Sequence, residues 1–286
     1  MGCHSFDVTT RRGFLAAAAA AAAISNLPRA MRAATGSTFD RVGLQLYTLR
    51  SEMAKSVDTV LERVAAIGYR EVEFAGYFNR DPAALRAKLD SLSLSAPACH
   101  VGLPAVEAGF AATAAAAKMI GHRWLVVASV PGRELTSVAS IKALAGRFNE
   151  IGKRALDAGL RLGYHNHNVE FRLVEGAVPY DILLGETDPT LVDFEMDLYW
   201  ITQAGSDPLA YFAKHPGRFT LVHVKDSAGP PSHAMRDVGA GVIDWNAIFA
   251  ERRQAGIVHY LVEHDDPANP YASVAASYNY LHALKF

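Results

Sequence analysis

Short apolar runs alternate with amphipathic stretches along most of the chain. Apolar and β-branched residues dominate eight short segments, which are residues 42–47, 70–74, 96–100, 123–128, 161–165, 191–196, 219–224 and 258–262. Near-continuous apolar runs are typical of strands that are covered on both faces, as in parallel sheets. The pattern therefore predicts eight buried strands, beginning at residue 42.

The segments between these runs carry helical signals. Apolar residues between 57 and 64 recur at intervals of three and four, which is the period of a helix with one buried face. An aspartate that precedes a proline is typical of an N-cap, and it occurs at Asp81, Asp188 and Asp207. Asp244 caps a further predicted helix, which Gly256 ends.

Eight strand–helix units in one chain predict a single (β/α)8 TIM barrel, an α/β fold that typically needs about 250 residues. We place this catalytic domain at residues 35–286. A doubly wound open sheet is the alternative. It is disfavoured because no Gly-x-Gly-x-x-Gly motif follows the first predicted strand.

The N-terminus predicts an export signal. Arg11 and Arg12 precede an apolar stretch at residues 14–24, which is shorter than the roughly 20 residues that span a bilayer. We therefore interpret residues 1–34 as a twin-arginine signal peptide and linker, without stable membrane insertion, and expect a periplasmic or otherwise exported protein. The alternative is an alanine-rich first helix of the fold.

The composition of the chain limits the kinds of partner and cross-link that we expect. Half of the 286 residues are hydrophobic, which suffices for a large core, and the formal net charge is −1. Cleavage of the signal would remove four arginines and one aspartate, so the mature chain is more acidic and a nucleic-acid partner is not expected. Cys3 and Cys99 are the only cysteines, which excludes a disulfide framework. A homo-oligomer is compatible with these features.

Polar side chains end most of the predicted strands. The C-terminal ends of barrel strands meet at one face, where the chemistry of TIM barrels gathers. Carboxylates and imidazoles converging there from several strands are typical of one divalent cation, such as Mn²⁺, Co²⁺, Mg²⁺ or Zn²⁺, although a hydrogen-bonded polar layer is the alternative. The strand-end residues are Glu73, His100, His165, Asp197, His223 and Glu263.

Other residues near the strand ends are candidates for substrate binding. Glu73 and His100 either contact substrate or close hydrogen bonds within the barrel. Trp200 and Lys225 follow two of the strands, and Arg236 could reach a sugar oxygen. Beside Arg236, the glycine-containing segment 237–245 is either an anion-binding turn before a helix or a plain connection.

Several motifs together resemble the xylose-isomerase-like barrel superfamily of sugar isomerases and epimerases. The resemblance covers residues 42–286 and rests on YHNHNVEF (164–171), MDLYW (196–200), HVKD (223–226), GAGVIDW (239–245) and LVEHD (261–265). Ketose 3-epimerases of this group resemble the chain in placing a divalent metal at the ends of strands 5 to 8. The resemblance implies metal ligands at Asp197, His223 and Glu263.

The strand-5 position departs from those epimerases, which have a glutamate there. His165 takes this place here, with His167 as the competitor because residues two apart share one face of a strand. Inosose dehydratases and keto-glycoside lyases look like relatives that carry histidines at this position. Endonuclease IV is another relation, but the acidic mature chain argues against a DNA substrate.

The leading functional hypothesis is a metal-dependent isomerase or epimerase that removes a proton α to a keto-sugar carbonyl. Glu263, His165 and His167 are the candidate catalytic residues, acting on a small sugar or keto-glycoside. The first alternative is a lyase or dehydratase that eliminates β to a ketone. It needs one base and a proton donor for the leaving oxygen, and histidine suits the second role. A non-catalytic sugar-binding barrel is the second alternative.

Overall fold

The computed structural model describes Met1 and residues 38–286. The paired arginines and the apolar stretch of the predicted signal lie outside the described residues, so the signal and the domain boundary at residue 34 stay predictions. Residues 38–284 form one compact unit. Within the described part of the chain, no helix is both long and apolar enough to cross a membrane.

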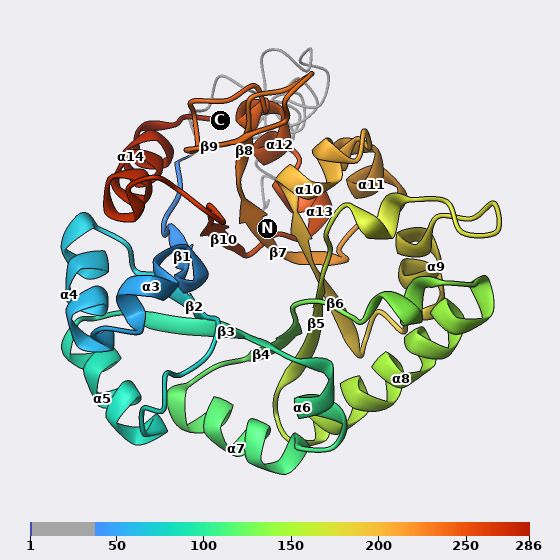
Figure 1. The fold of residues 1–286 in the computed structure, drawn as a ribbon, viewed down its shortest axis with the longest axis horizontal. Coiled ribbons are helices and arrows are strands. Elements are labelled where there is room, and N and C mark those ends of the chain that lie inside the picture. Colours follow the sequence, from blue (N-terminus) through green and yellow to red (C-terminus); the bar gives the residue numbers. More distant parts are fainter. Residues whose placement is uncertain (2–37) are drawn as a thin grey trace. The chain divides into compact units, whose positions relative to one another are not determined.

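Eight parallel strands close into a barrel, which confirms the predicted TIM-barrel fold (Figure 1). The strands follow the order β1-β10-β7-β6-β5-β4-β3-β2 around the barrel. Each predicted apolar run overlaps one of them, with β3 and β6 extending past the predicted bounds by one residue at one or both ends. Their bounds are β1 (Gly43–Gln45), β2 (Glu71–Phe74), β3 (Ser95–Val101), β4 (Trp124–Val127), β5 (Arg161–His165), β6 (Val192–Asp197), β7 (Phe219–Val224) and β10 (His259–Val262).

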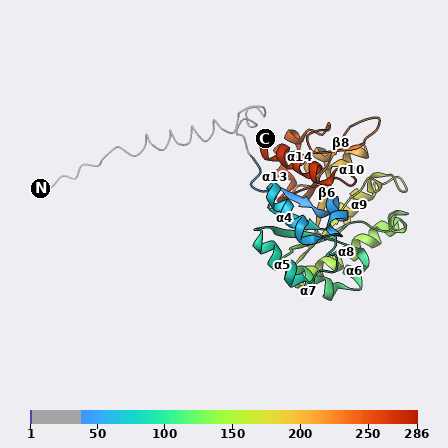
Figure 2. The ribbon, with the colours of Figure 1, turned by 60° about the vertical axis from the view of Figure 1, so that its left-hand side comes forward.

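Helices surround the strands, and α14 and α8 lie on opposite sides of the barrel in Figure 1, while Figure 2 shows the helices from a second side. The longer ones are α4 (Val57–Ile67), α5 (Pro82–Ser91), α7 (Phe110–Ile120), α8 (Val138–Asp157), α9 (Pro179–Glu186) and α14 (Pro270–Ala283). The shorter ones are α3 (Arg50–Met53), α6 (Leu103–Glu107), α10 (Leu198–Gln203), α11 (Pro208–Lys214), α12 (Trp245–Ala250) and α13 (Arg252–Ala255). Three 3₁₀ turns span Leu46–Leu49, Gly132–Leu135 and Val169–Phe171.

Three of the four aspartates that were predicted to be helix N-caps have this role in the structure. Asp81, Asp207 and Asp244 each accept a backbone N–H in the first turn of α5, α11 and α12. The helix predicted after Asp188 is wrong. There the carboxylate accepts the N–H of Thr190 in a turn that leads into β6, so a local turn takes the place of a helix start.

The strand–helix unit that begins with β7 is more divided than expected. One helix was predicted from Asp244 to Gly256, but α12 ends at Ala250 and the separate α13 follows before Gly256. A small antiparallel pair, β8 (Asp226–Ser227) and β9 (Met235–Arg236), also lies between β7 and α12. This pair carries the connection after β7 outward from the strand end.

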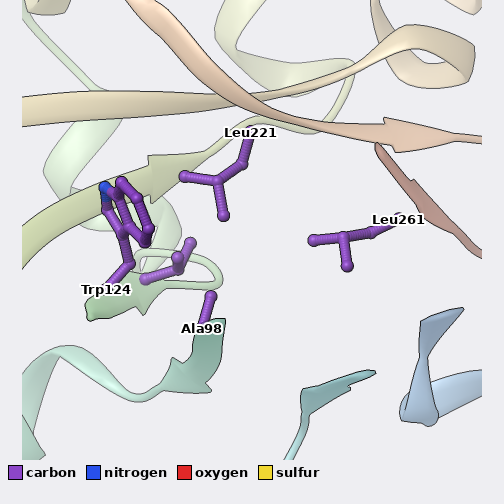
Figure 3. Packing of buried hydrophobic residues seen from close by; sticks show 5 residues of the cluster. Ala98, Trp124, Leu221 and Leu261 are labelled. Atoms are coloured by element: carbon purple, nitrogen blue, oxygen red, sulfur yellow. The ribbon is translucent and has the colours of Figure 1, made fainter. Parts of the chain in front are cut away.

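An apolar cluster fills the barrel interior on the N-terminal side of the strand ends. Its members point toward one another from β3, β4, β7 and β10 and are Ala98, Trp124, Val126, Leu221 and Leu261 (Figure 3). Residues two positions further along a strand share its inward face. Ala98, Leu221 and Leu261 are therefore followed, one layer up, by His100, His223 and Glu263, so the apolar cluster forms the floor beneath a polar layer.

Candidate functional site

A cavity of about 620 Å³ opens at the C-terminal ends of the strands. That volume lies within the range of small-molecule sites. Its lining includes five of the residues singled out from the sequence. They are His100, His165, His167, Lys225 and Glu263.

Four strand-end side chains converge at the base of this cavity. His165 ends β5, Asp197 ends β6, His223 lies in β7, and Glu263 directly follows β10. Their ligand atoms all lie within 4.8 Å of one another, and all four residues are buried. These are the four predicted metal ligands, and we call them the upper cluster. It is His165, and not His167, that the structure brings into this cluster.

The arrangement of the upper cluster fits a divalent cation. Nδ1 of His223 lies 2.8 Å from Oε2 of Glu263 and 3.7 Å from Oδ2 of Asp197. Even so, this buried nitrogen has no hydrogen-bond partner of acceptable geometry in the part of the chain that the structure describes. Two carboxylates and two imidazoles that face one point form a borderline donor set, suited to Zn²⁺, Mn²⁺ or Co²⁺.

The imidazole at the end of β5 is suited to metal binding by its protonation state. Burial, with a contribution from the neighbouring His223, lowers the pKa of His165 to about 3. Its Nε2 lies 3.3 Å from Oδ2 of Asp197. The ring is therefore neutral at ordinary pH, which is the form that coordinates a metal.

Lys225 supplies positive charge at the same place. Its Nζ lies 2.6 Å from Glu263, 2.7 Å from Asp265 and 3.0 Å from Asp197. Burial alone would lower the pKa of Lys225, but these carboxylates raise it well above its ordinary value. The pKa of Asp197 changes in the opposite direction. Burial raises it, but Lys225 and His165 lower it more, so that the pKa of Asp197 is about 2. Both partners are therefore charged at neutral pH.

Glu263 is likewise held as a carboxylate. Burial raises its pKa, but the charges of Lys225 and His223 outweigh that effect and bring the pKa well below the ordinary value. Since Glu263 also lines the cavity, an unprotonated acceptor faces the space where a small molecule would bind.

A second group of polar side chains lies against the other edge of the His223 ring. It consists of Glu73, His100, Glu195 and His223, with ligand atoms within 4.8 Å of one another, and we call it the lower cluster. Glu195 was missed in the sequence, although it stands two positions before Asp197 in β6 and so shares its inward face. Glu73 does not line the cavity, because it is buried within this cluster.

His167 and Trp200 lie beside the upper cluster. The His167 ring centre is 4.9 Å from that of His165 and 5.6 Å from that of Trp200. Glu170 holds this turn by accepting the backbone N–H of His167 and the hydroxyl of Tyr164. Trp200 has a buried indole N–H without a hydrogen-bond partner among the described residues, but, unlike His167, it does not line the cavity.

The glycine-containing segment 237–245 is a connection and not an anion-binding turn. The carboxylate of Asp226 accepts the backbone N–H groups of Gly239, Gly241 and Ile243 and the indole N–H of Trp245. A Cβ at Gly241 would lie only 2.1 Å from that carboxylate. The donors that could have held an anion are therefore bound by the chain itself.

The structure leaves Arg236 away from the cavity and brings two unpredicted residues to it. Arg236 lies exposed in β9 and does not line the cavity, because the β8–β9 pair directs this segment away from the strand ends. In contrast, Tyr47 and Arg50 line the cavity and were missed. Arg50 lies over the Tyr47 ring and donates to the backbone carbonyl of Asp265. Their segment carries no motif that would have marked it.

Comparison with known proteins agrees with this geometry. Residues 61–281 match the family model described as the xylose isomerase-like TIM barrel. The chain belongs to this family. It is 25% identical over 274 residues to an inosose dehydratase of Lacticaseibacillus casei, with 81% of this chain and 91% of that protein covered.

Solved structures are similar to the chain in fold. A sugar phosphate isomerase/epimerase from Parabacteroides distasonis is 27% identical and superposes with a TM-score of 0.75, covering 85% of this chain and 98% of that one. The structure of a protein called IolI with a bound zinc atom superposes with a TM-score of 0.62 and covers 84% of this chain and 95% of that one. At 15% identity this second likeness shows the fold alone.

Proposed function

We propose that the protein is a metal-dependent enzyme that removes a proton from the carbon next to a keto-sugar carbonyl. The observation that carries this proposal is the upper cluster, in which four buried ligand atoms face one point at the base of the cavity. The relatives bear out the prediction of an enzyme acting on sugars. A divalent cation held by His165, Asp197, His223 and Glu263 would polarise the carbonyl and stabilise the negative charge that develops on it.

The proton-transfer roles follow from the residues around the cavity. The carboxylate of Glu263 accepts the α proton because its low pKa leaves it ionised. The ammonium of Lys225, 2.6 Å away, keeps this carboxylate charged and adds positive charge beside the developing enediolate. The ring of His167, which lines the cavity, is placed to donate to a sugar oxygen.

The fate of the enediolate separates two outcomes. Return of the proton to the neighbouring carbon or to the opposite face gives isomerisation or epimerisation. Loss of an oxygen from the β carbon gives dehydration or glycoside cleavage. Elimination is favoured by the histidines of this region. A histidine occupies the strand-5 position, and His167 lines the cavity, where it can donate a proton to a leaving oxygen. Several relatives are inosose dehydratases, which supports the same outcome.

A product assay tests this proposal. The Mn²⁺-loaded protein is incubated in D₂O with keto-inositols, ketohexoses and 3-keto-glycosides, and products are followed by NMR. Elimination gives an unsaturated sugar or a released aglycone. Isomerisation or epimerisation gives deuterium at the α carbon without either product. Absence of both with every substrate class would favour the binding-only alternative.

We further propose that the chain is exported through its twin-arginine segment and acts in the periplasm on a small sugar or keto-glycoside. The paired Arg11 and Arg12 before a short apolar stretch support this. Replacement of both by lysine should leave the protein in the cytoplasmic fraction. Undiminished export of that variant would contradict the proposal.

A further inference from the structure

His223 stands between two groups of ligand atoms. Its Nδ1 faces the upper cluster, at 2.8 Å from Glu263. Its Nε2 points the other way, at 2.9 Å from Oε2 of Glu73 and 3.1 Å from Oε2 of Glu195. Each nitrogen of one ring therefore faces a separate set of carboxylates.

The four atoms of the lower cluster have nearly the spacing of a tetrahedral metal site. His100 Nε2 lies 2.7 Å from Glu195 Oε2 and 3.5 Å from Glu73 Oε2. Together with the two His223 distances, these separations run from 2.7 to 3.5 Å. Ligands about 2.0–2.2 Å from a central Zn²⁺ are roughly 3.3–3.6 Å apart. An expansion by a few tenths of an ångström would admit the ion.

The charge balance of the lower cluster is unusual. Glu73 and Glu195 are fully buried, and within the described part of the chain their ion-pair partners are only the imidazoles of His100 and His223. Each glutamate also has a second carboxylate oxygen, Oε1, that is buried and has no hydrogen-bond partner among residues 38–286. Burying several ionisable groups together is costly, whereas a divalent cation would neutralise both carboxylates and could also take up the free oxygens.

We propose that Glu73, His100, Glu195 and Nε2 of His223 form a second divalent-cation site, suited to Zn²⁺, beneath the proposed catalytic metal. Four protein ligands with no open position are typical of a closed, structural zinc site. Gln45 supports it by donating a hydrogen bond to Oε2 of Glu73. With both sites filled, each ring nitrogen of His223 would serve one ion, which would require the imidazole to release its remaining ring proton to solvent. This site does not depend on the proposed reaction.

The test is the metal stoichiometry of the full mature chain. Metal-free protein is titrated with Zn²⁺, and bound zinc is measured by elemental analysis after removal of free ion. The wild type should bind two ions per chain. Glu195→Gln, which keeps a carbonyl oxygen for the His223 ring, should bind one. Glu71→Gln is the matched control, because Glu71 is a buried glutamate on the same strand as Glu73 that pairs with His259 outside both clusters, and it should bind two.

Asp197→Asn separates this inference from the proposed function. If both are right, this variant also binds one ion, held by the lower cluster. A different result would overturn the second site and still support the proposed catalytic metal. In that case the wild type binds one ion, Asp197→Asn binds none, and Glu195→Gln still binds one. The opposite result would support the second site and overturn the catalytic metal. In that case the wild type binds one ion, Asp197→Asn still binds one, and Glu195→Gln binds none. Circular dichroism of each variant excludes loss of binding through unfolding.

Discussion

The Nζ of Lys225 lies 2.6 Å from Oε2 of Glu263, so the proposed base is held in a buried ion pair at the base of the cavity. The same ammonium also contacts Asp197 and Asp265, and its side chain is only 2% exposed. One cation therefore balances several carboxylates in a place that water hardly reaches. This relationship explains how two carboxylate ligands can be kept charged and close together before a metal arrives.

Removal of this cation should destabilise the metal-free protein. Lys225→Met leaves Asp197 and Glu263 buried without their partner, and breaking a buried pair from one side costs roughly 3–5 kcal/mol. Denaturant unfolding in the presence of a chelator measures this loss. Lys118→Met, on the exposed face of α7, is the control and should change stability little. An unchanged midpoint in Lys225→Met would show that the ion pair is not formed.

The carboxylate of Asp226 should be essential for the order of segment 237–245. Because it accepts three backbone N–H groups of that segment and the Trp245 indole, Asp226→Ala leaves several donors unpaired and should cost roughly 2–4 kcal/mol. Amide hydrogen exchange at Gly239 and Gly241 should become faster. Asp188→Ala, at an exposed turn, should leave both measurements near those of the wild type. Unchanged exchange at the two glycines would contradict this account.

His122 should make the stability of the protein depend on pH. Burial lowers the pKa of His122 to about 4, and its Nδ1 lies 2.7 Å from the carbonyl oxygen of Ala96. As the pH falls, the His122 imidazole binds a proton near pH 6.5 in the unfolded chain but only near pH 4 in the folded chain. The stabilising contribution is thus complete above about pH 6.5 and is lost as the pH falls toward 4, by roughly 3 kcal/mol in all.

The variant His122→Gln isolates this effect. It should unfold with a shallower pH dependence than the wild type between pH 6.5 and 4, because the other titrating groups are common to both. His282→Gln, at an exposed position on α14, is the matched control and should keep the wild-type slope. Equal slopes in all three proteins would show that His122 is not held neutral by the fold.

The part of the site that follows from strand periodicity could be predicted from the sequence. Each β-rich run marks a strand, and the polar residues at the ends of parallel barrel strands gather at one face, which predicts that Asp197, His223 and Glu263 lie together. The same alternation would have found Glu195, two residues before Asp197. It was overlooked because a buried glutamate within an apolar run resembles part of the core strand.

The parts that depend on loop paths could not be predicted in this way. Tyr47 and Arg50 come to the cavity through a 3₁₀ turn and a short helix after β1, and no local pattern fixes where those elements point. Arg236 fails for the same reason, since the β8–β9 pair sets its direction. Asp226 shows a related limit. Its role as acceptor for a distant turn depends on tertiary packing, although its identity within HVKD was evident.

The most direct test of the central claim is the loss of an α-deuterium label from a keto-sugar. A keto-inositol deuterated next to its carbonyl is incubated in H₂O with the metal-loaded wild type and with metal-loaded Glu263→Gln, and wash-out of the label is followed by NMR. The account predicts that the wild type releases deuterium and that the variant, with bound metal confirmed by elemental analysis, does so at least about 10²-fold more slowly. Equal wash-out by the two proteins would contradict the assignment of Glu263 as the base.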